Sequence, residues 1–365
     1  MMAALRSSCL ALLIALSVTS AQVIADDRPT VRLESQTAVL AIDLGGGSIV
    51  DFHLAGGMNP LRWLAPGDED KPFRPTAHFL CLDRWGPPSD AERRNGMPFH
   101  GEAARVEWTQ LGSPEHLDGR ILVVMDATLP LAGLQVRRTV GLSESAAFFS
   151  VSETVTNRNK LGRIYNMVQH ATIGPPFLDE TTVIDSNAQK GFMQSSPLPD
   201  PERVEIRWPE AIKEDKPVDL RRLTTDPDPN VTSFIIDGDL GWITATNASK
   251  ELLIGYIFRP ADYPWIDIWR YVENGKPFAR GLEFGTTGLH QPFRVLLAKP
   301  RIFGRPTFAY LDAGESATRV YTAFLMKVPR DFAGVNQVLY RDGRIVVQER
   351  GTRERELTIA VDRLF

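Results

Sequence analysis

The sequence predicts an all-β protein built as one large antiparallel β-sandwich. Short runs of β-branched and aromatic residues recur along the chain, turn residues separate them, and no long helical period interrupts them. Strands without interleaved helices bury their apolar faces by stacking as antiparallel sheets. The chain has 365 residues and no clear linker in its middle, which favours one large sandwich over two small ones.

The chain begins with a segment that has the features of an export signal. Arg6 precedes a short apolar run at residues 9–18, and small residues suited to cleavage follow it. The run is too short to span a bilayer comfortably. We therefore expect a signal peptide at residues 1–25 and a secreted or periplasmic mature chain at residues 26–365. An uncleaved membrane anchor is the alternative.

Composition and charge argue against several classes of protein. The net charge is -4, the pI is near 5.9, and the basic residues are scattered, so nothing favours nucleic-acid binding. No later run has the length and apolarity of a membrane helix, so we expect no membrane contact after cleavage. Cys9 leaves with the signal, and Cys81 alone cannot form an internal disulfide. The fold must therefore rest on a packed core.

No resident metal or cofactor is expected. The six histidines include no pair at the one-residue or three-residue separation that would place two ligands together on a strand or helix. The glycines at residues 45–47 are not followed by a helix, so a phosphate-binding loop is disfavoured.

The expected strands follow one another along most of the chain, and two hairpins stand out. The tetrapeptide at residues 247–250 is typical of a turn, and Asp342-Gly343 is a strong hairpin signal between two apolar runs. The strand-like runs lie at residues 31–33, 37–42, 121–125, 148–156, 241–246, 252–258, 320–326, 338–340 and 345–347.

One stretch departs from the pattern. Residues 187–230 are rich in proline and charge, and strand-like sequence resumes at Val231. We interpret this stretch as a surface insertion within one domain. Long loops on rigid scaffolds often shape binding clefts, although a plain surface insertion is equally open.

Four separated motifs carry chemistry-bearing residues. The first is a glycine-rich bend at residues 44–52 followed by a turn that ends in Trp63, and the second joins His100, Gly101, Arg105 and Trp108. The third places His170 at the end of a strand-like run. In the fourth, an aromatic segment at residues 263–270 precedes Gly281-Leu282-Glu283.

In this order, the four motifs resemble those of the aldose 1-epimerase (galactose mutarotase) family over most of residues 31–326. The resemblance implies a large β-sandwich with Glu283 as catalytic base and His170 as catalytic acid. Three departures stand out: Arg105 lies one residue beyond the family's arginine, Phe284 replaces a common proline, and residues 171–178 differ from the family's wall segment. Substrate choice should therefore differ too.

The resemblance also implies a sugar-binding set. His100 and Arg105 would donate to sugar hydroxyls, and Trp269 and Trp108 would offer flat apolar faces. Asp237, before Gly238, is a further candidate acceptor for a substrate hydroxyl. Core packing is the competing interpretation for each tryptophan, and a tight turn is the competing interpretation for Asp237.

The predicted function is the interconversion of sugar anomers by general acid/base catalysis. Two alternatives remain open: a non-catalytic carbohydrate-binding protein, and a polysaccharide lyase-like enzyme that would use Tyr263, Tyr271 or Arg270. The sequence has no Gly-x-Ser-x-Gly elbow, so a serine hydrolase is unsupported.

Overall fold

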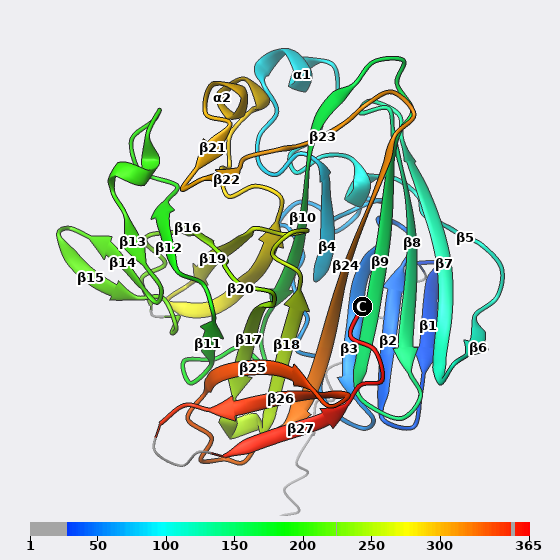
Figure 1. The fold of residues 1–365 in the computed structure, drawn as a ribbon, viewed down its shortest axis with the longest axis vertical. Coiled ribbons are helices and arrows are strands. Elements are labelled where there is room, and N and C mark those ends of the chain that lie inside the picture. The colour runs from blue at the N-terminus through cyan, green and yellow to red at the C-terminus, as the bar shows by residue number, and fades with distance from the viewer. Residues whose placement is uncertain (1–27, 224, 352–354) are drawn as a thin grey trace, which may run out of the picture.

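The computed structural model describes residues 28–223, 225–351 and 355–365. The expected signal peptide at residues 1–25 lies outside this part of the chain. The described residues form an all-β protein in which two large antiparallel sheets face each other across one core (Figure 1). The predicted large β-sandwich is confirmed.

The larger sheet has eleven strands among the described residues, and β23 (Ala309–Leu311) pairs with β10 outside the main path. In spatial order, the other strands are β1 (Thr30–Glu34), β2 (Ala38–Asp43), β3 (Ser48–Leu54), β4 (His78–Asp83), β10 (Arg163–Ile173), β20 (Lys276–Gly285), β19 (Trp265–Glu273), β16 (Val231–Ile235), β12 (Lys190–Met193) and β13 (Ile206–Arg207).

The second sheet has nine strands in the described chain, and β6 (Glu115–Leu117) pairs with β7 beside the main path. In spatial order, the others are β11 (Val183–Ser186), β17 (Gly241–Asn247), β18 (Leu252–Phe258), β24 (Ser316–Lys327), β9 (Phe148–Asn157), β8 (Leu134–Ser143), β7 (Arg120–Leu129) and β5 (Thr109–Gln110).

The central strands of the larger sheet are buried on both faces. Every residue of β4 is buried, as is nearly all of β10 and β20. By contrast, β9 of the second sheet alternates between buried and half-buried positions, as expected for a strand with one covered face. The outer face of β4, β10 and β20 must therefore be covered by something other than the second sheet.

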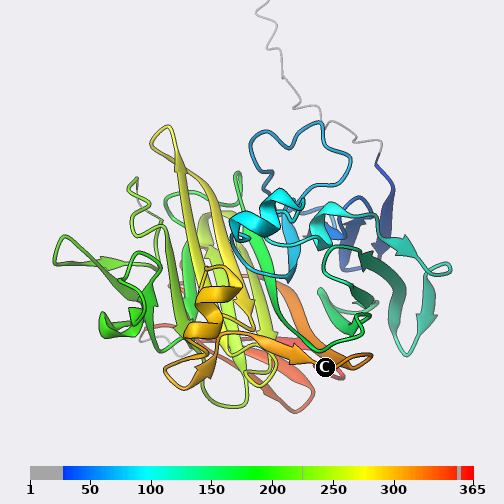
Figure 2. The ribbon, with the colours of Figure 1, turned by 90° about the horizontal axis from the view of Figure 1, so that it is seen from above.

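Loops and two short helices supply that cover. Helix α1 (Asp90–Arg94) follows β4, helix α2 (Phe293–Ala298) follows β20, and both lie at the same end of the sheets (Figure 1). Seen from above, the loop at residues 55–77 and the β19–β20 hairpin project on the same side of the molecule (Figure 2). The 3-10 helices are η1 (Ala103–Arg105), η2 (Pro201–Arg203) and η3 (Ala248–Lys250).

A third sheet closes the outer face of the nine-stranded sheet. Its strands β25 (Val335–Arg341), β26 (Arg344–Glu349) and β27 (Glu356–Ala360) cross the end of β17 and β18 (Figure 1). Asp342 and Gly343 both have positive φ, of 51° and 67°, which confirms the predicted hairpin turn. The remaining strands form two small hairpins, β14 (Glu210–Lys213) with β15 (Lys216–Asp219) and β21 (Arg301–Ile302) with β22 (Arg305–Pro306).

The proline-rich stretch at residues 187–230 is only partly a surface excursion. Its first strand, β12, pairs with β16 and extends the larger sheet, while the β14–β15 hairpin is mostly exposed. Ala211, Leu220 and Leu223 are buried in the main core. Edge strands tolerate prolines and charges, which is why the composition concealed these short strands.

Candidate active site

Register places the expected acid and base side by side. His170 on β10 pairs with Glu283 on β20, so both side chains leave the same face of the larger sheet. This face points away from the main core. His170 Nε2 lies 3.2 Å from Glu283 Oε1, and the two side chains are only 6% and 1% exposed.

The two residues line a cavity of about 310 Å³. Most of its walls are aromatic or histidine side chains, contributed by the outer face of the sheet and by the loops that cover it. The lining residues are Trp63, Ala65, Pro75, Trp85, Phe99, His100, Arg105, His170, Asn230, Val231, Trp269, Glu283 and His290.

Glu283 is held by contacts on both oxygens. The Trp85 indole N–H donates to Oε2 at 2.8 Å, while Oε1 faces His170. Burial is the main cause that raises the pKa of Glu283 well above its usual range, the Asp267 carboxyl raises it further, and the Trp85 hydrogen bond opposes them. A proton on this carboxyl is therefore favoured at neutral pH.

The imidazole of His170 belongs to a cluster of aromatic rings in which Phe79 and Trp63 also stack on each other. Phe79 stacks on the imidazole with ring centroids 4.3 Å apart, and Trp63 stacks at 5.9 Å. Its Nδ1 lies 3.0 Å from the hydroxyl of Thr172. Burial lowers the pKa of His170 to about 3, so the ring is neutral at physiological pH.

His100 is fixed by a reciprocal contact with Gly86. The main-chain N–H of His100 donates to the Gly86 carbonyl, and the main-chain N–H of Gly86 donates to the ring nitrogen Nδ1 of His100, both at 3.1 Å. Burial lowers the pKa of His100 well below its usual range. Because Nδ1 accepts a hydrogen bond in a neutral ring, the proton is on Nε2, which makes that nitrogen a donor.

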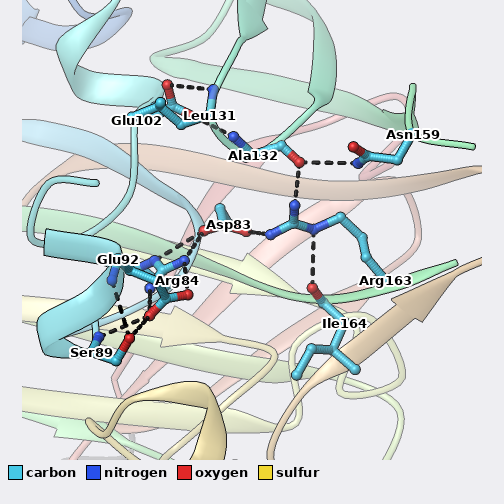
Figure 3. Close-up of polar contacts among 10 residues, drawn as sticks. All are labelled: Asp83, Arg84, Ser89, Glu92, Glu102, Leu131, Ala132, Asn159, Arg163 and Ile164. Atoms are coloured by element: carbon cyan, nitrogen blue, oxygen red, sulfur yellow. Dashed lines mark hydrogen bonds and ion pairs between the residues drawn. The ribbon is translucent and has the colours of Figure 1, made fainter. Parts of the chain in front are cut away.

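The segment that carries Trp85 and His100 is anchored at both ends (Figure 3). At its start, Asp83 accepts hydrogen bonds from Arg84 and Arg163. Ser89 and Glu92 form a capping box on α1, and Glu92 also binds Arg84. The Arg84 and Ser89 contacts lower the pKa of Glu92 to about 2, although burial opposes them.

At the far end of this segment, Glu102 accepts hydrogen bonds from the main-chain N–H groups of Leu131 and Ala132 (Figure 3). The loop is thereby tied to the strand pair β7–β8. Such anchoring suits a site whose donors must be held in place before a ligand arrives.

The structure brings together five of the seven residues singled out from the sequence. His170, Glu283, His100, Arg105 and Trp269 all line the cavity. Arg105 lies on η1, and its guanidinium binds Asp68 at 2.7 Å. It therefore faces the cavity as a member of an ion pair.

Trp108 and Asp237 lie elsewhere, against the expectation from sequence. Trp108 is 1% exposed, donates to the Ala103 carbonyl at 2.8 Å and packs under the Arg138 guanidinium. Asp237 forms an ion pair with Arg305. For Trp108, the competing interpretation of core packing describes the position better than a substrate contact does.

The residues suggested for lyase chemistry do not line the cavity either. Tyr263 is fully buried among Phe258, Phe284 and Gln169 on the core side of the sheet. Arg270 lies one position from Trp269 on β19, so its side chain leaves the opposite face. Tyr271 stacks on Trp269 at the edge of the site, 5.7 Å away.

Several lining residues were not singled out from the sequence. Trp85 lies two residues beyond the buried strand β4, and His290 lies seven residues beyond Glu283 in a glycine-containing segment. Gly86 has φ of +97°, and a Cβ there would lie 2.8 Å from the His290 ring. The position of His290, seven residues after the expected base, is the sequence feature from which it could have been identified.

A larger groove, of about 870 Å³, lies between the third sheet and residues 186–187 and 239–242. The residues that line it, all within the described part of the chain, include no histidine. Among the described residues, no cluster of histidine, cysteine and carboxylate side chains is arranged to hold a metal ion. No helix in the described ranges has the length and apolarity needed to cross a membrane.

Solved structures with the same fold include galactose mutarotase-like proteins. A galactose mutarotase-like protein from Clostridium acetobutylicum superposes with a TM-score of 0.61 at 15% identity, covering 82% of this chain and 96% of that one. A candidate aldose 1-epimerase from Escherichia coli K12 gives 0.58 at 16% identity, covering 82% and 99%.

A galactose mutarotase-like protein from Lactobacillus casei gives a TM-score of 0.57 at 14% identity, covering 82% of this chain and all of the other. No protein-family model matches the sequence, and no curated protein sequence matches it. The chain therefore has the galactose mutarotase-like fold, and its chemistry must be argued from its own site.

Proposed function

We propose that this protein interconverts the anomers of a free aldose by general acid/base catalysis at His170 and Glu283. The observation that supports this most strongly is the 3.2 Å contact between His170 Nε2 and Glu283 Oε1 at the wall of an aromatic cavity. Mutarotation needs proton transfer at two oxygens that are bonded to the same carbon. An adjacent acid and base suit that requirement.

The pair carries one mobile proton at neutral pH, because burial holds the imidazole neutral and favours protonated Glu283. Transfer of this proton to Nε2 gives an imidazolium acid and a carboxylate base. Glu283 then removes the proton from the anomeric hydroxyl while His170 protonates the ring oxygen. The C1–O5 bond breaks, a C1=O1 aldehyde forms, and ring closure after rotation about C1–C2 reverses both transfers.

The other cavity residues would bind the sugar. His100 Nε2–H is a fixed donor, and Trp63 and Trp269 offer apolar faces to the C–H surface of a pyranose. Because the Arg105 guanidinium is already paired with Asp68, a neutral aldose suits the cavity better than a sugar phosphate or uronate. We also propose that the protein acts outside the cytoplasm, as its first residues suggest.

The proposal predicts catalysis that fails when either member of the pair is changed. Wild type should accelerate α/β exchange of at least one neutral aldose without added metal or cofactor, measured by NMR saturation transfer or polarimetry. Glu283→Gln should abolish the acceleration, because an amide cannot accept the anomeric proton. His170→Asn should reduce the rate about a hundredfold or more, as is typical for the loss of a general acid.

His116→Asn is the matched control, since this histidine is 69% exposed and pairs with Glu144 away from the cavity. It should keep the wild-type rate. If wild type turns over no sugar, yet sugars still quench the fluorescence of the cavity tryptophans, the protein is a carbohydrate-binding module and the enzymatic proposal fails.

A further inference from the structure

A row of paired residues crosses the larger sheet beneath the cavity. Phe79 on β4 pairs with His170, His170 pairs with Glu283, and Glu283 pairs with Asp267 on β19. Asp267 in turn pairs with Ser233 on β16. Paired residues leave the same face of a sheet, and their Cβ atoms lie about 4.5–5.5 Å apart in antiparallel pairs. The row therefore places two carboxyl groups next to each other.

We propose that Asp267 is a positioning residue of the His170–Glu283 pair, and that its carboxyl controls how firmly the pair retains its single proton. This inference rests on the proposed function for its catalytic meaning. The proton coupling itself is a property of the folded protein and can be measured without any sugar.

Burying two neighbouring carboxyl groups costs free energy, which points to a functional role for Asp267. Asp267 is fully buried and Glu283 is 1% exposed. Neither oxygen of Asp267 makes a hydrogen bond of good geometry, and burial raises the pKa of Asp267 well above its usual range, although the nearby Ser233 hydroxyl opposes this shift. Two adjacent carboxylates in an apolar site cannot both be charged at low cost, so one of them keeps a proton.

The surrounding groups favour Glu283 as the carboxyl that retains the proton. The Ser233 hydroxyl accepts from the Gln194 amide at 2.7 Å, which leaves its own hydrogen free for Asp267. Charge on Asp267 raises the pKa of Glu283, in addition to the larger effect of burial. The proton held by Glu283 is the one that the proposed mechanism uses.

None of the other titratable groups that face the two carboxyls carries a charge that could replace that of Asp267 beside Glu283. His170 on β10 is neutral at physiological pH, as are His100 and His290 from the covering loops, because burial lowers the pKa of each ring. On β4, the pKa of Cys81 is raised well above its usual range by burial and by both carboxyls, so the thiol is uncharged. Arg105, the cation at the cavity wall, is paired with Asp68.

Infrared titration of Asp267→Asn tests the proposal directly. In wild type, the C=O band of a buried protonated carboxyl should persist to neutral pH, and Glu283→Gln should remove it. In Asp267→Asn, the pKa reported by that band should fall by about one pH unit or more, because a neighbouring charge has been removed. Asp43→Asn is the control, since this buried aspartate on β2 pairs with Arg28 away from the cavity.

Activity supplies the second readout. Loss of the shared proton ends catalysis at high pH, so Asp267→Asn should move the alkaline limb of the kcat profile to lower pH by the same amount. At a fixed pH above the limb, the rate relative to the plateau should fall about tenfold for each pH unit by which the limb moves. The proposal is overturned if Asp267→Asn loses activity equally at all pH values and the pKa from its infrared titration equals that of wild type. Asp267 would then have a structural role only.

Should Asp267→Asn fail to fold, Glu283→Gln allows the reciprocal measurement. Because Glu283 is still neutral when Asp267 loses its proton, the titration of Asp267 in that variant should stay where it is in wild type, below that of Glu283. An Asp267 titration that moves to lower pH in Glu283→Gln contradicts the assignment of the retained proton to Glu283 and overturns the proposal. A shifted infrared titration in a protein that turns over no sugar supports the coupling while rejecting the enzymatic function.

Discussion

Gly281 determines where the carboxylate of Glu283 can lie. It occupies an extended strand position two residues before Glu283, on the same face of β20. A Cβ at this position would lie 2.7 Å from Glu283 Oε1 and 3.0 Å from the Trp269 Cβ. The space beside Gly281 is therefore occupied by the Glu283 side chain itself.

Gly281→Ala should therefore displace the carboxylate from His170 and reduce the mutarotation rate by about tenfold to a hundredfold, because small displacements of catalytic groups are costly. Gly255→Ala is the matched control, since its Cβ would lie 2.4 Å from the Phe324 ring in the other sheet. Both variants should lose about 1–3 kcal/mol of stability, measured by denaturant unfolding. Equal activity in the two variants would contradict this role for Gly281.

At the scale of single residues, the sequence was informative where a residue's type limits its chemistry. His170 and Glu283 could be singled out because their side chains can exchange protons and because the motifs that carry them resemble, in their order, those of the mutarotase family. Trp108 could not be separated from the cavity tryptophans, because a buried indole in the core and one in a site differ only in their neighbours. Asp267 was hidden because its importance depends on the strand register that pairs it with Glu283.

At the scale of elements, the third sheet behaves as part of the sandwich. Val338, Ile345 and Val347 bury their side chains against the outer face of the nine-stranded sheet. That face contributes Phe148, Trp242, Leu253, Ile257 and Phe324. The Asp342-Gly343 turn predicted one hairpin of this sheet, but local sequence contains no information on which face a hairpin covers.

Val347→Asp should destabilise the whole sandwich rather than the third sheet alone. Val347 is 0% exposed, so the change buries an unpaired carboxylate and should cost about 3 kcal/mol or more. Thr358→Asp, on an exposed position of β27, is the control and should stay within about 0.5 kcal/mol of wild type. Urea unfolding followed by tryptophan fluorescence and by circular dichroism should give one coincident transition at lower denaturant; two separate transitions would show an independent C-terminal unit.

At the scale of the whole molecule, the two-sided burial of the larger sheet explains why its strands were harder to delimit than those of the second sheet. Strands with one solvent face alternate in polarity, and β9 shows this alternation along the predicted run at residues 148–156. Strand β4 is buried throughout because loops cover its outer face, so it lacks the alternation. The same covering loops create the cavity, so the least predictable part of the fold is also the part that forms the site.

Buried histidines on both faces of this sheet should make the stability of the molecule depend on pH. Burial lowers the pKa of His78 and His170 to about 3 and that of His290 to about 4, and it lowers the pKa of His100 well below its usual range. Each ring binds a proton in the unfolded chain below about pH 6.5 but not in the folded protein. Stability from these groups is therefore complete above about pH 6.5 and is lost as the pH falls through the range down to about 3.

Glu283 and Asp267 act in the opposite direction, because their raised pKa values let the folded protein bind protons that the unfolded chain has already released. Four histidines outweigh two carboxyls, so the free energy of unfolding should decrease as the pH is lowered from about 6.5 to about 4.5. Each uncompensated proton contributes about 1.4 kcal/mol per pH unit. The slope therefore measures the number of histidines that the fold keeps neutral, less the protons that the two carboxyls retain.

His78→Asn isolates one of these groups. His78 lies between the sheets, with Nε2 3.3 Å from the Gln169 amide oxygen and its ring against Tyr256, away from the cavity. The variant should reduce the slope of unfolding free energy against pH by the contribution of about one proton. Because asparagine does not titrate in this range, any general loss of packing lowers the whole curve without altering its slope. An unchanged slope in His78→Asn, measured by urea unfolding at several pH values, would show that this ring is already protonated in the fold.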